Sequence, residues 1–223
     1  MLNVSEKIKQ FVGISFWDSI YKALTFRDFF IAAFPACMKR RVQKVRKAQA
    51  RKIEQLQKQG KARVLFFLQT PSVWKYDALY RQLEKSEWFE PIAVVSPYNV
   101  HLNYDKGECF RVMQQTEAFA QQQGYTYTSA YDWTKKKWRD IKKLYQPDIV
   151  FFTKPYKDTL RAYHIYNFPE ALTLYLPYGI NCINLFHNTY GLPFQALLWK
   201  FLVEAEFQKR FAEQYEKSHG VNA

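Results

Sequence analysis

"PDIVFFTKPY", residues 147–156, is a short apolar run that ends in lysine, proline and tyrosine. The same arrangement recurs in "RVLFFLQTPSVW" (63–74), "PIAVVSPYN" (91–99) and "TLYLPYGIN" (173–181). The apolar residues are consecutive rather than alternating, as expected of strands whose two faces are both covered by helices. These runs therefore predict a buried sheet, and each of them ends in proline together with aromatic or amide side chains.

Residues 61–192 alternate between strand-like and helix-like patterns. The expected strands are 63–69, 91–96, 125–128, 148–153 and 172–177, and the expected helices are 76–87, 107–123, 133–145 and 157–166. The helix 107–123 has the clearest limits, because Asp105 precedes it and Gly124 follows it. This alternation predicts an α/β fold with a doubly wound, mostly parallel, Rossmann-like sheet.

Helical segments are expected on both sides of this sheet domain. Residues 1–60 show no strand pattern, and a helix from about 36 to 59 begins after Pro35 and ends at Gly60. Residues 193–219 keep a helical spacing of apolar side chains, which predicts one long helix. The expected organisation is a helical extension (1–60), a sheet domain (61–192) and a long terminal helix (193–223).

The polar ends of the strands meet at one edge if the sheet is parallel, and open parallel sheets bind ligands at that edge. The residues expected to bind substrate there are Thr70, Trp74, Tyr98, Asn99, Lys154, Tyr156, Gly179 and Asn181. Lysine matches an anion, amides bind hydroxyl groups and aromatic rings supply flat contact area, so a hydroxyl-rich or phosphorylated substrate is favoured. The alternative interpretation is that proline and aromatic residues only terminate the strands and cover the sheet edge.

Common catalytic and cofactor signatures are missing from the sequence. It contains no GxGxxG, Walker loop, GxSxG, HExxH or DxD motif, so a dinucleotide fingerprint, a P-loop, a serine hydrolase and common metal sites lack support. The cysteines are widely spaced without CxxC, which favours reduced thiols in a cytoplasmic protein. We therefore expect neither a metal nor another bound cofactor.

Positive charge is concentrated in one part of the chain. Residues 39–63 contain eleven Lys or Arg and one Glu, a balance of +10 out of the net +13 of the whole chain. No apolar run reaches the roughly 18 residues that a membrane-spanning helix needs. An anionic partner is therefore expected to meet the basic segment rather than the whole surface.

An aromatic-rich stretch, 16–34, precedes the basic segment, and this pairing is typical of a helix that lies on an anionic membrane. The residues expected to contact the membrane are Trp17, Phe30, Lys39, Arg40, Arg41, Lys44, Arg46 and Lys47. A solvated helix whose thin apolar stripe packs on the sheet domain is the first alternative. Nucleic acid is the second, and we expect none, because no aromatic residues are interleaved with the cations of 39–63.

Four stretches together resemble the CDP-glycerol glycerophosphotransferase family over about residues 62–222. They are "VLFFLQTPSVWKYDALYRQLEKSEWFEPIAVVSPYN", "PDIVFFTKPY", "ALTLYLPYGIN" and "NTYGLPFQALLWKFLVEAEFQKRFAEQYEKSHGVN". Such enzymes prime or polymerise teichoic acids and related capsular polymers. The resemblance implies a GT-B transferase, with two Rossmann-like domains facing across a cleft, that works without a bound metal at the inner face of the cell membrane. It also implies two substrates, a CDP-activated polyol donor and a lipid-linked or polymeric acceptor.

The sequence departs from the family pattern at the catalytic base. Family members carry Trp-His-Gly-Thr-Pro after the last strand of this domain, whereas this chain has Pro177-Tyr178-Gly179. The resemblance therefore implies either Tyr178 or His187 as the group that takes the proton of the acceptor.

The half of the family that grips cytidine diphosphate follows the long helix, where this chain ends. We expect either a fragment or an acceptor-binding half that is inactive without a second domain. The rival class is a non-enzymatic, flavodoxin-like binding or scaffold module with a basic tether for a membrane or nucleic acid.

Overall fold

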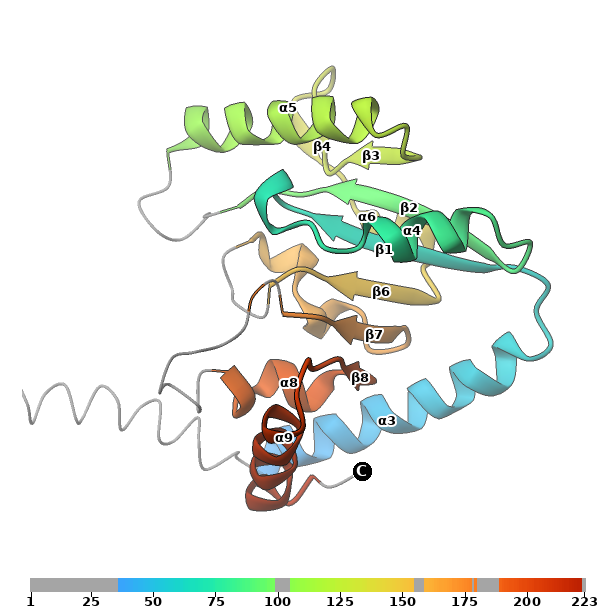
Figure 1. Cartoon of the computed structure of the whole chain (residues 1–223), viewed down its shortest axis with the longest axis vertical. Helices are drawn as coiled ribbons and strands as arrows, with labels where there is room; N and C mark the ends of the chain where they lie inside the picture. Colours follow the sequence, from blue (N-terminus) through green and yellow to red (C-terminus); the bar gives the residue numbers. More distant parts are fainter. Residues whose placement is uncertain (1–35, 99–104, 155–158, 178, 180–188, 222–223) are drawn as a thin grey trace, which may run out of the picture.

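The computed structural model describes residues 36–98, 105–154, 159–177, 179 and 189–221. Its main feature is a six-stranded sheet with helices on both faces (Figure 1). The strands of this sheet are β1 (Ala62–Leu68), β2 (Phe89–Val95), β3 (Tyr127–Ser129), β6 (Ile149–Phe152), β7 (Leu172–Tyr175) and β8 (Lys200–Phe201). A separate antiparallel hairpin pairs β4 (Tyr131–Asp132) with β5 (Lys137–Trp138).

The strand order in the large sheet is β3-β2-β1-β6-β7-β8, and every neighbouring pair is parallel. The chain builds outward from β1 to β3, then crosses back to the other side of β1 and builds outward again from β6 to β8. The direction of strand addition therefore reverses between β1 and β6, which is the topological switch point of a doubly wound fold. The predicted parallel α/β sheet is confirmed.

Both faces of the sheet carry a hydrophobic core. One face packs against α4 (Asp77–Glu84) and α5 (Lys106–Gln122), and the other against α3 (Ala36–Leu56), α6 (Ile141–Tyr145), α8 (Pro193–Leu197) and the 3₁₀ turns η2 (Arg161–Tyr163) and η3 (Ile165–Asn167). In β1, Val64, Phe66 and Leu68 point into the first core, while Leu65 and Phe67 point into the second. This double burial explains why the strand is apolar at every one of these positions.

The helix predicted over 107–123 is confirmed as α5, with the expected cap at each end. The carboxylate of Asp105 accepts hydrogen bonds from the backbone N–H of Gly107 at 2.8 Å and of Glu108 at 3.3 Å. Gly124, at φ +68°, follows the helix in the left-handed conformation that glycine adopts without strain. A short 3₁₀ turn, η1 (Pro71–Val73), precedes α4 on the same face of the sheet.

The helix predicted over 133–145 is wrong in its first half. The chain there forms the β4–β5 hairpin, and only the residues of α6 are helical. The Asp132 carboxylate accepts a hydrogen bond from the Lys135 N–H at 2.9 Å, and Lys136 adopts a left-handed φ of 51°. Trp138 packs against Tyr131 with ring centroids 4.9 Å apart. A local turn and aromatic packing therefore outweigh the helical pattern.

The helix predicted over 157–166 is also wrong for its described part, which forms the successive turns η2 and η3. His164 between them is extended, with ψ 150°, so the two turns do not join. The Tyr163 hydroxyl is hydrogen-bonded to the carbonyls of Ala130 at 3.1 Å and Arg139 at 2.9 Å. These contacts connect the turns to the β4–β5 hairpin and hold them in place.

The single helix predicted over 193–219 is divided by a sixth strand. α8 ends at Leu197, β8 follows, and α9 spans Glu206–His219. Trp199 N–H donates to the Thr173 carbonyl at 2.8 Å and Leu202 N–H to the Tyr175 carbonyl at 2.9 Å, so this backbone extends the sheet instead of a helix. Residues 193–223 therefore do not form a separate helical segment, because β8 belongs to the large sheet.

The helix predicted from about 36 to 59 is confirmed as α3, and it packs on the sheet domain. Val42 and Val45 are 1% and 6% exposed and lie in the core shared with α8. Gln49 is also buried, and its amide donates to the Leu197 carbonyl at 3.2 Å. The thin apolar stripe therefore serves the core, and the cationic positions that remain exposed face outward.

Candidate functional site

A buried glutamine fixes the carboxyl ends of the three central strands. Gln69, directly after β1, accepts a hydrogen bond from the Thr153 hydroxyl at 3.3 Å and donates to the Pro97 carbonyl at 3.5 Å. Its own carbonyl accepts from the hydroxyl of Thr116 on α5 at 3.3 Å. Gln69 is only 4% exposed, so these bonds are made away from solvent. They hold the residues after β1, β2 and β6 in a fixed relation.

The hydroxyl of Tyr76 is inserted between the ends of β6 and β7. Leu172 N–H donates to the Asp148 carbonyl at 2.8 Å, and parallel hydrogen bonds repeat every two residues along a strand. Continuing that register places Leu176 N–H opposite the Phe152 carbonyl. Instead of a direct bond, the Tyr76 hydroxyl donates to Phe152 O at 2.8 Å and accepts from Leu176 N–H at 3.0 Å. One phenol therefore separates the two strands just before the edge of the sheet.

Aromatic packing holds Tyr76 in this position. Its ring lies 5.5 Å from that of Phe66 and 5.3 Å from that of Phe151, measured between centroids, and the side chain is 2% exposed. Burial raises the pKa of the Tyr76 phenol above its usual range, so the hydroxyl keeps its proton and remains a donor. Tyr76 is not among the site residues predicted from the sequence, although it directly follows the loop that leaves β1.

Lys154 and Tyr98 meet across the end of β1. They follow β6 and β2, the two strands that flank β1, and the lysine Nζ lies 3.6 Å from the centre of the tyrosine ring. A contact between an ammonium and a ring face contributes about 0.5–2 kcal/mol and leaves the positive charge intact. The edge therefore presents an oriented cation beside the switch point, where open parallel sheets bind their ligands.

Most of the other predicted substrate-binding residues, and both predicted catalytic residues, fall into three groups. Thr70 follows Gln69 at the same edge, and its hydroxyl shares a hydrogen bond of 3.0 Å with that of Ser72. Gly179 follows β7 and is partly buried, and a Cβ added to it would have no heavy atom within 4 Å. The predicted residues Asn99, Tyr156, Tyr178, Asn181 and His187 lie outside the described residues.

Trp74 lies over the face of the sheet rather than at its carboxyl edge. Its indole packs edge-on to Phe66, in the middle of β1, with ring centroids 5.9 Å apart. The indole N–H donates to the Tyr125 hydroxyl at 3.0 Å, and that hydroxyl donates in turn to the Asp77 carboxylate. The expectation that Trp74 contacts substrate together with Tyr98 and Lys154 is therefore not met by this geometry.

The predicted membrane-contacting cations of α3 differ in their surroundings. Lys39, Arg40, Lys44 and Lys47 are exposed. Arg41 donates to the Tyr166 carbonyl at 3.1 Å and lies over the ring of the same tyrosine, and Arg46 lies 3.6 Å from the Glu216 carboxylate. Trp17 and Phe30 lie outside the described residues. Arg41 and Arg46 therefore make intramolecular contacts that attach α3 to the rest of the fold.

Two other features are not found among the described residues. Among them, no group of three or more His, Cys, Asp or Glu side chains is placed to hold a metal ion. The same part of the chain has no helix whose length and apolarity would let it cross a membrane. Cys109 is a buried free thiol, and burial raises its pKa, which favours the unreactive protonated form.

Comparison of this chain with protein-family models, with curated proteins and with solved structures found no match. The carboxyl edge itself is therefore the candidate site: an oriented lysine, a tyrosine ring and a threonine are held beside the switch point by Gln69 and Tyr76.

Proposed function

We propose that this chain is the acceptor-binding half of a transferase of the CDP-glycerol glycerophosphotransferase type, one half of a GT-B enzyme. The observation that carries the proposal is the Lys154 ammonium stacked on Tyr98 beside the switch point. A fixed cation flanked by an aromatic ring and the hydroxyl of Thr70 suits a phosphorylated polyol. The resemblance of residues 62–222 to that family supplies the reaction class.

In this reaction an acceptor hydroxyl attacks the β-phosphorus of CDP-glycerol. A new P–O bond forms to the acceptor, the bond between the β-phosphorus and the bridging oxygen breaks, and CMP leaves with that oxygen. The proton of the attacking hydroxyl passes to a base, for which Tyr178 and His187 are the candidates. Lys154 would bind phosphate oxygens of the acceptor and stabilise their negative charge.

We also propose that the protein works at the inner face of the cell membrane, where its acceptor would be linked to lipid. The exposed cations Lys39, Arg40, Lys44 and Lys47 on α3 support that placement, since each cation near an anionic surface contributes up to ~1 kcal/mol. The exposed side of α3 would contact the membrane, because Val42 and Val45 of the same helix are buried in the core.

The test is equilibrium binding of a short glycerol phosphate oligomer to the full chain, measured by calorimetry. Wild-type protein is expected to bind it, and Lys154→Met is expected to weaken binding about tenfold, equivalent to ~1.4 kcal/mol. Lys137→Met is the matched control, because this exposed lysine of β5 lies in the separate hairpin.

Three results would overturn the proposal. They are no binding by the wild-type chain, equal binding by Lys154→Met, and displacement of the oligomer by CDP-glycerol at the same site. The last result would assign the donor rather than the acceptor to this edge. Glycerol without phosphate is expected not to bind, because it offers nothing to the Lys154 charge.

A further inference from the structure

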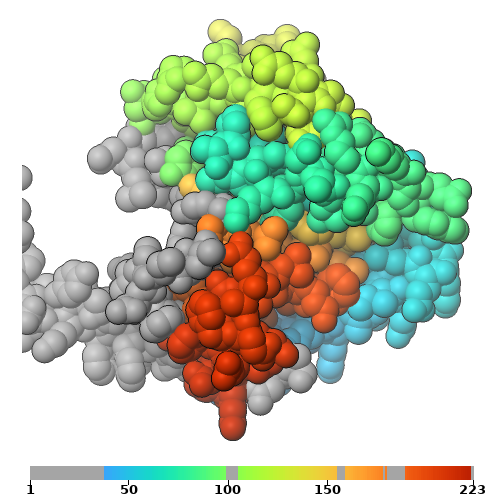
Figure 2. Space-filling model, viewed as in Figure 1, coloured from blue at the N-terminus to red at the C-terminus, as the bar shows by residue number. Residues whose placement is uncertain are grey.

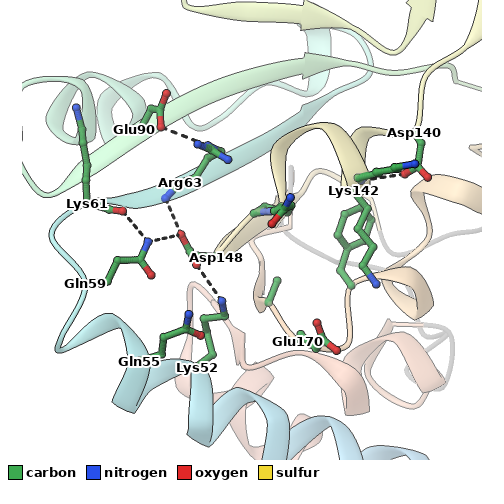
Figure 3. A pocket seen from close by; sticks show the side chains of 15 residues that line it. Lys52, Gln55, Gln59, Lys61, Arg63, Glu90, Asp140, Lys142, Asp148 and Glu170 are labelled. Atoms are coloured by element: carbon green, nitrogen blue, oxygen red, sulfur yellow. Dashed lines mark hydrogen bonds and ion pairs between the residues drawn. The ribbon is translucent and has the colours of Figure 1, made fainter.

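The amino ends of the strands, opposite the candidate site, border two hollows of different chemistry. The larger has a volume of about 630 Å³ and lies between α3, α6 and the first residues of β1 and β6 (Figure 3). Its polar lining includes Lys52, Gln55, Gln59, Lys61, Arg63, Glu90, Asp140, Lys142, Lys143, Gln146, Asp148 and Glu170. Both its cations and its amides could bind a polar ligand.

Several of these charges are already satisfied within the fold. Asp148 is 5% exposed and accepts from Lys52 Nζ at 2.9 Å and from Arg63 N–H at 2.9 Å, and Arg63 Nε lies 3.3 Å from Glu90 (Figure 3). The side chains of three exposed lysines, Lys61, Lys142 and Lys143, make no hydrogen bond or ion pair with the described residues. These lysines are the groups of this pocket that can bind an anion.

The smaller hollow is a groove of about 340 Å³ with an apolar lining. It is formed by side chains at the end of α3, at the start of β2 and along the first residues of β6, β7 and β8: Ile53, Leu56, Trp88, Phe89, Ile149, Leu172 and Trp199. Trp88 is 60% exposed, the largest exposed fraction among the large hydrophobic residues of the described chain. In Figure 2 the surface around β6 and β7 lies between α4 above and the C-terminal segment below, beside the end of α3.

The charged pocket and the apolar groove adjoin each other. Gln59 lines both of them. Neighbouring residues of the same strand starts also divide between them: Lys61 lines the pocket and Ala62 the groove, and Asp148 lines the pocket and Ile149 the groove. A ligand that crosses this edge of the sheet beside Gln59 would pass from an apolar surface to a charged one.

We propose that the amino edge of the sheet binds one molecule of a single-chain anionic phospholipid, with its hydrocarbon chain in the apolar groove and its headgroup in the charged pocket. The volume of each hollow lies within the range of roughly 300–1,000 Å³ that is usual for small-molecule sites. The chain covers Trp88 and Trp199, and the phosphate meets Lys61, which lines the pocket directly before the groove residue Ala62. A hydroxyl group of a glycerol headgroup donates to the amide oxygen of Gln59, which lines both hollows.

The mixed charge of the pocket selects the headgroup. Its lining has five Lys or Arg and four Asp or Glu, so it would not attract a highly charged polyanion. A single phosphate with hydroxyl groups fits better, since ammonium groups bind the phosphate oxygens and carboxylates accept from the hydroxyls. The binding is separate from the proposed transferase site, because it uses the opposite edge of the sheet.

The probe is 1-oleoyl lysophosphatidylglycerol, used below its critical micelle concentration with the full chain and followed by calorimetry. Saturable binding of one lipid per chain is expected. Trp88→Ala should weaken it about tenfold, or ~1.4 kcal/mol, whereas Phe207→Ala, which removes another exposed ring 43% accessible on α9, should not change it. Lys61→Gln should also weaken binding about tenfold, and Lys137→Gln should not.

Two ligands separate the parts of the lipid. Glycerol 3-phosphate, which lacks the chain, and lysophosphatidylcholine, which has the same chain but no headgroup hydroxyls, are both expected to bind at least about tenfold more weakly. Equal binding by lysophosphatidylcholine, unchanged binding by Trp88→Ala, or binding only to intact anionic vesicles would overturn the proposal, the last in favour of a membrane surface. Thermal melting of the exposed-residue variants checks that they fold, and Lys154→Met should bind the lipid normally.

Discussion

Replacement of Tyr76 by phenylalanine tests whether the hydroxyl between β6 and β7 supports the carboxyl edge. The variant keeps the ring, which Phe66 and Phe151 hold in place, so the two strands stay apart and cannot form the direct bond. The Phe152 carbonyl, in a residue 5% exposed, then loses its donor, and Leu176 N–H loses its acceptor. An unsatisfied buried group costs about 1–3 kcal/mol, so we expect the free energy of unfolding to fall by about 2 kcal/mol.

Urea unfolding and thermal melting measure this loss, which corresponds to a decrease in Tm of roughly 4–8 °C for a domain of this size. Tyr127→Phe is the control, because Tyr127 is 37% exposed and a change there should stay within about 0.5 kcal/mol. The variant is also expected to bind the glycerol phosphate oligomer more weakly, because Lys154 lies two residues beyond Phe152. Wild-type stability in Tyr76→Phe would refute the inserted-hydroxyl interpretation.

Three other predictions follow from contacts elsewhere in the fold. Asp148→Ala should lower the free energy of unfolding by about 3–5 kcal/mol in urea, because it leaves Lys52 without its buried partner, and a loss below ~1 kcal/mol would contradict this. Asp105→Ala should cost about 1 kcal/mol through loss of the α5 cap, visible as earlier melting. Burial raises the pKa of Tyr80 and of Tyr125 to about 12, so the unfolded chain loses these protons first and stability should fall as pH rises from about 10 to 12. Urea unfolding across that range should show a shallower decline in Tyr80→Phe, and an unchanged decline would refute the assignment.

The strands of the sheet could be predicted from the sequence because their signal is strong and local. β1 and β6 are apolar at consecutive positions, which double coverage by helices requires. β8 could not be found in this way, because it has only two residues within an amphipathic pattern. What makes it a strand is the pairing of Trp199 and Leu202 with β7, a contact between residues about 26 positions apart, which periodicity does not encode.

The site was predictable to the extent that it follows from strand direction. Parallel pairing brings the residues after β2 and β6 to one edge, so Tyr98 and Lys154 meet as expected. Tyr76 was not predictable, because its role depends on a hydroxyl reaching two backbone groups of strands 76 and 100 residues further along the chain. Trp74 was misplaced for a related reason: a residue three to six positions after a strand can turn back over the sheet face and join the core there.

The two edges of the sheet can be tested independently because no residue argued for one contributes to the other. If the carboxyl edge binds the phosphorylated acceptor, Lys154→Met reduces oligomer binding while lipid binding stays intact. If the amino edge binds a phospholipid, Trp88→Ala has the opposite pattern. A single nonspecific anion site would instead respond to both lysine changes with both ligands, and the Trp88 ring would be irrelevant to it. The crossed design therefore distinguishes two built sites from the general attraction that a net charge of +13 exerts on any anion.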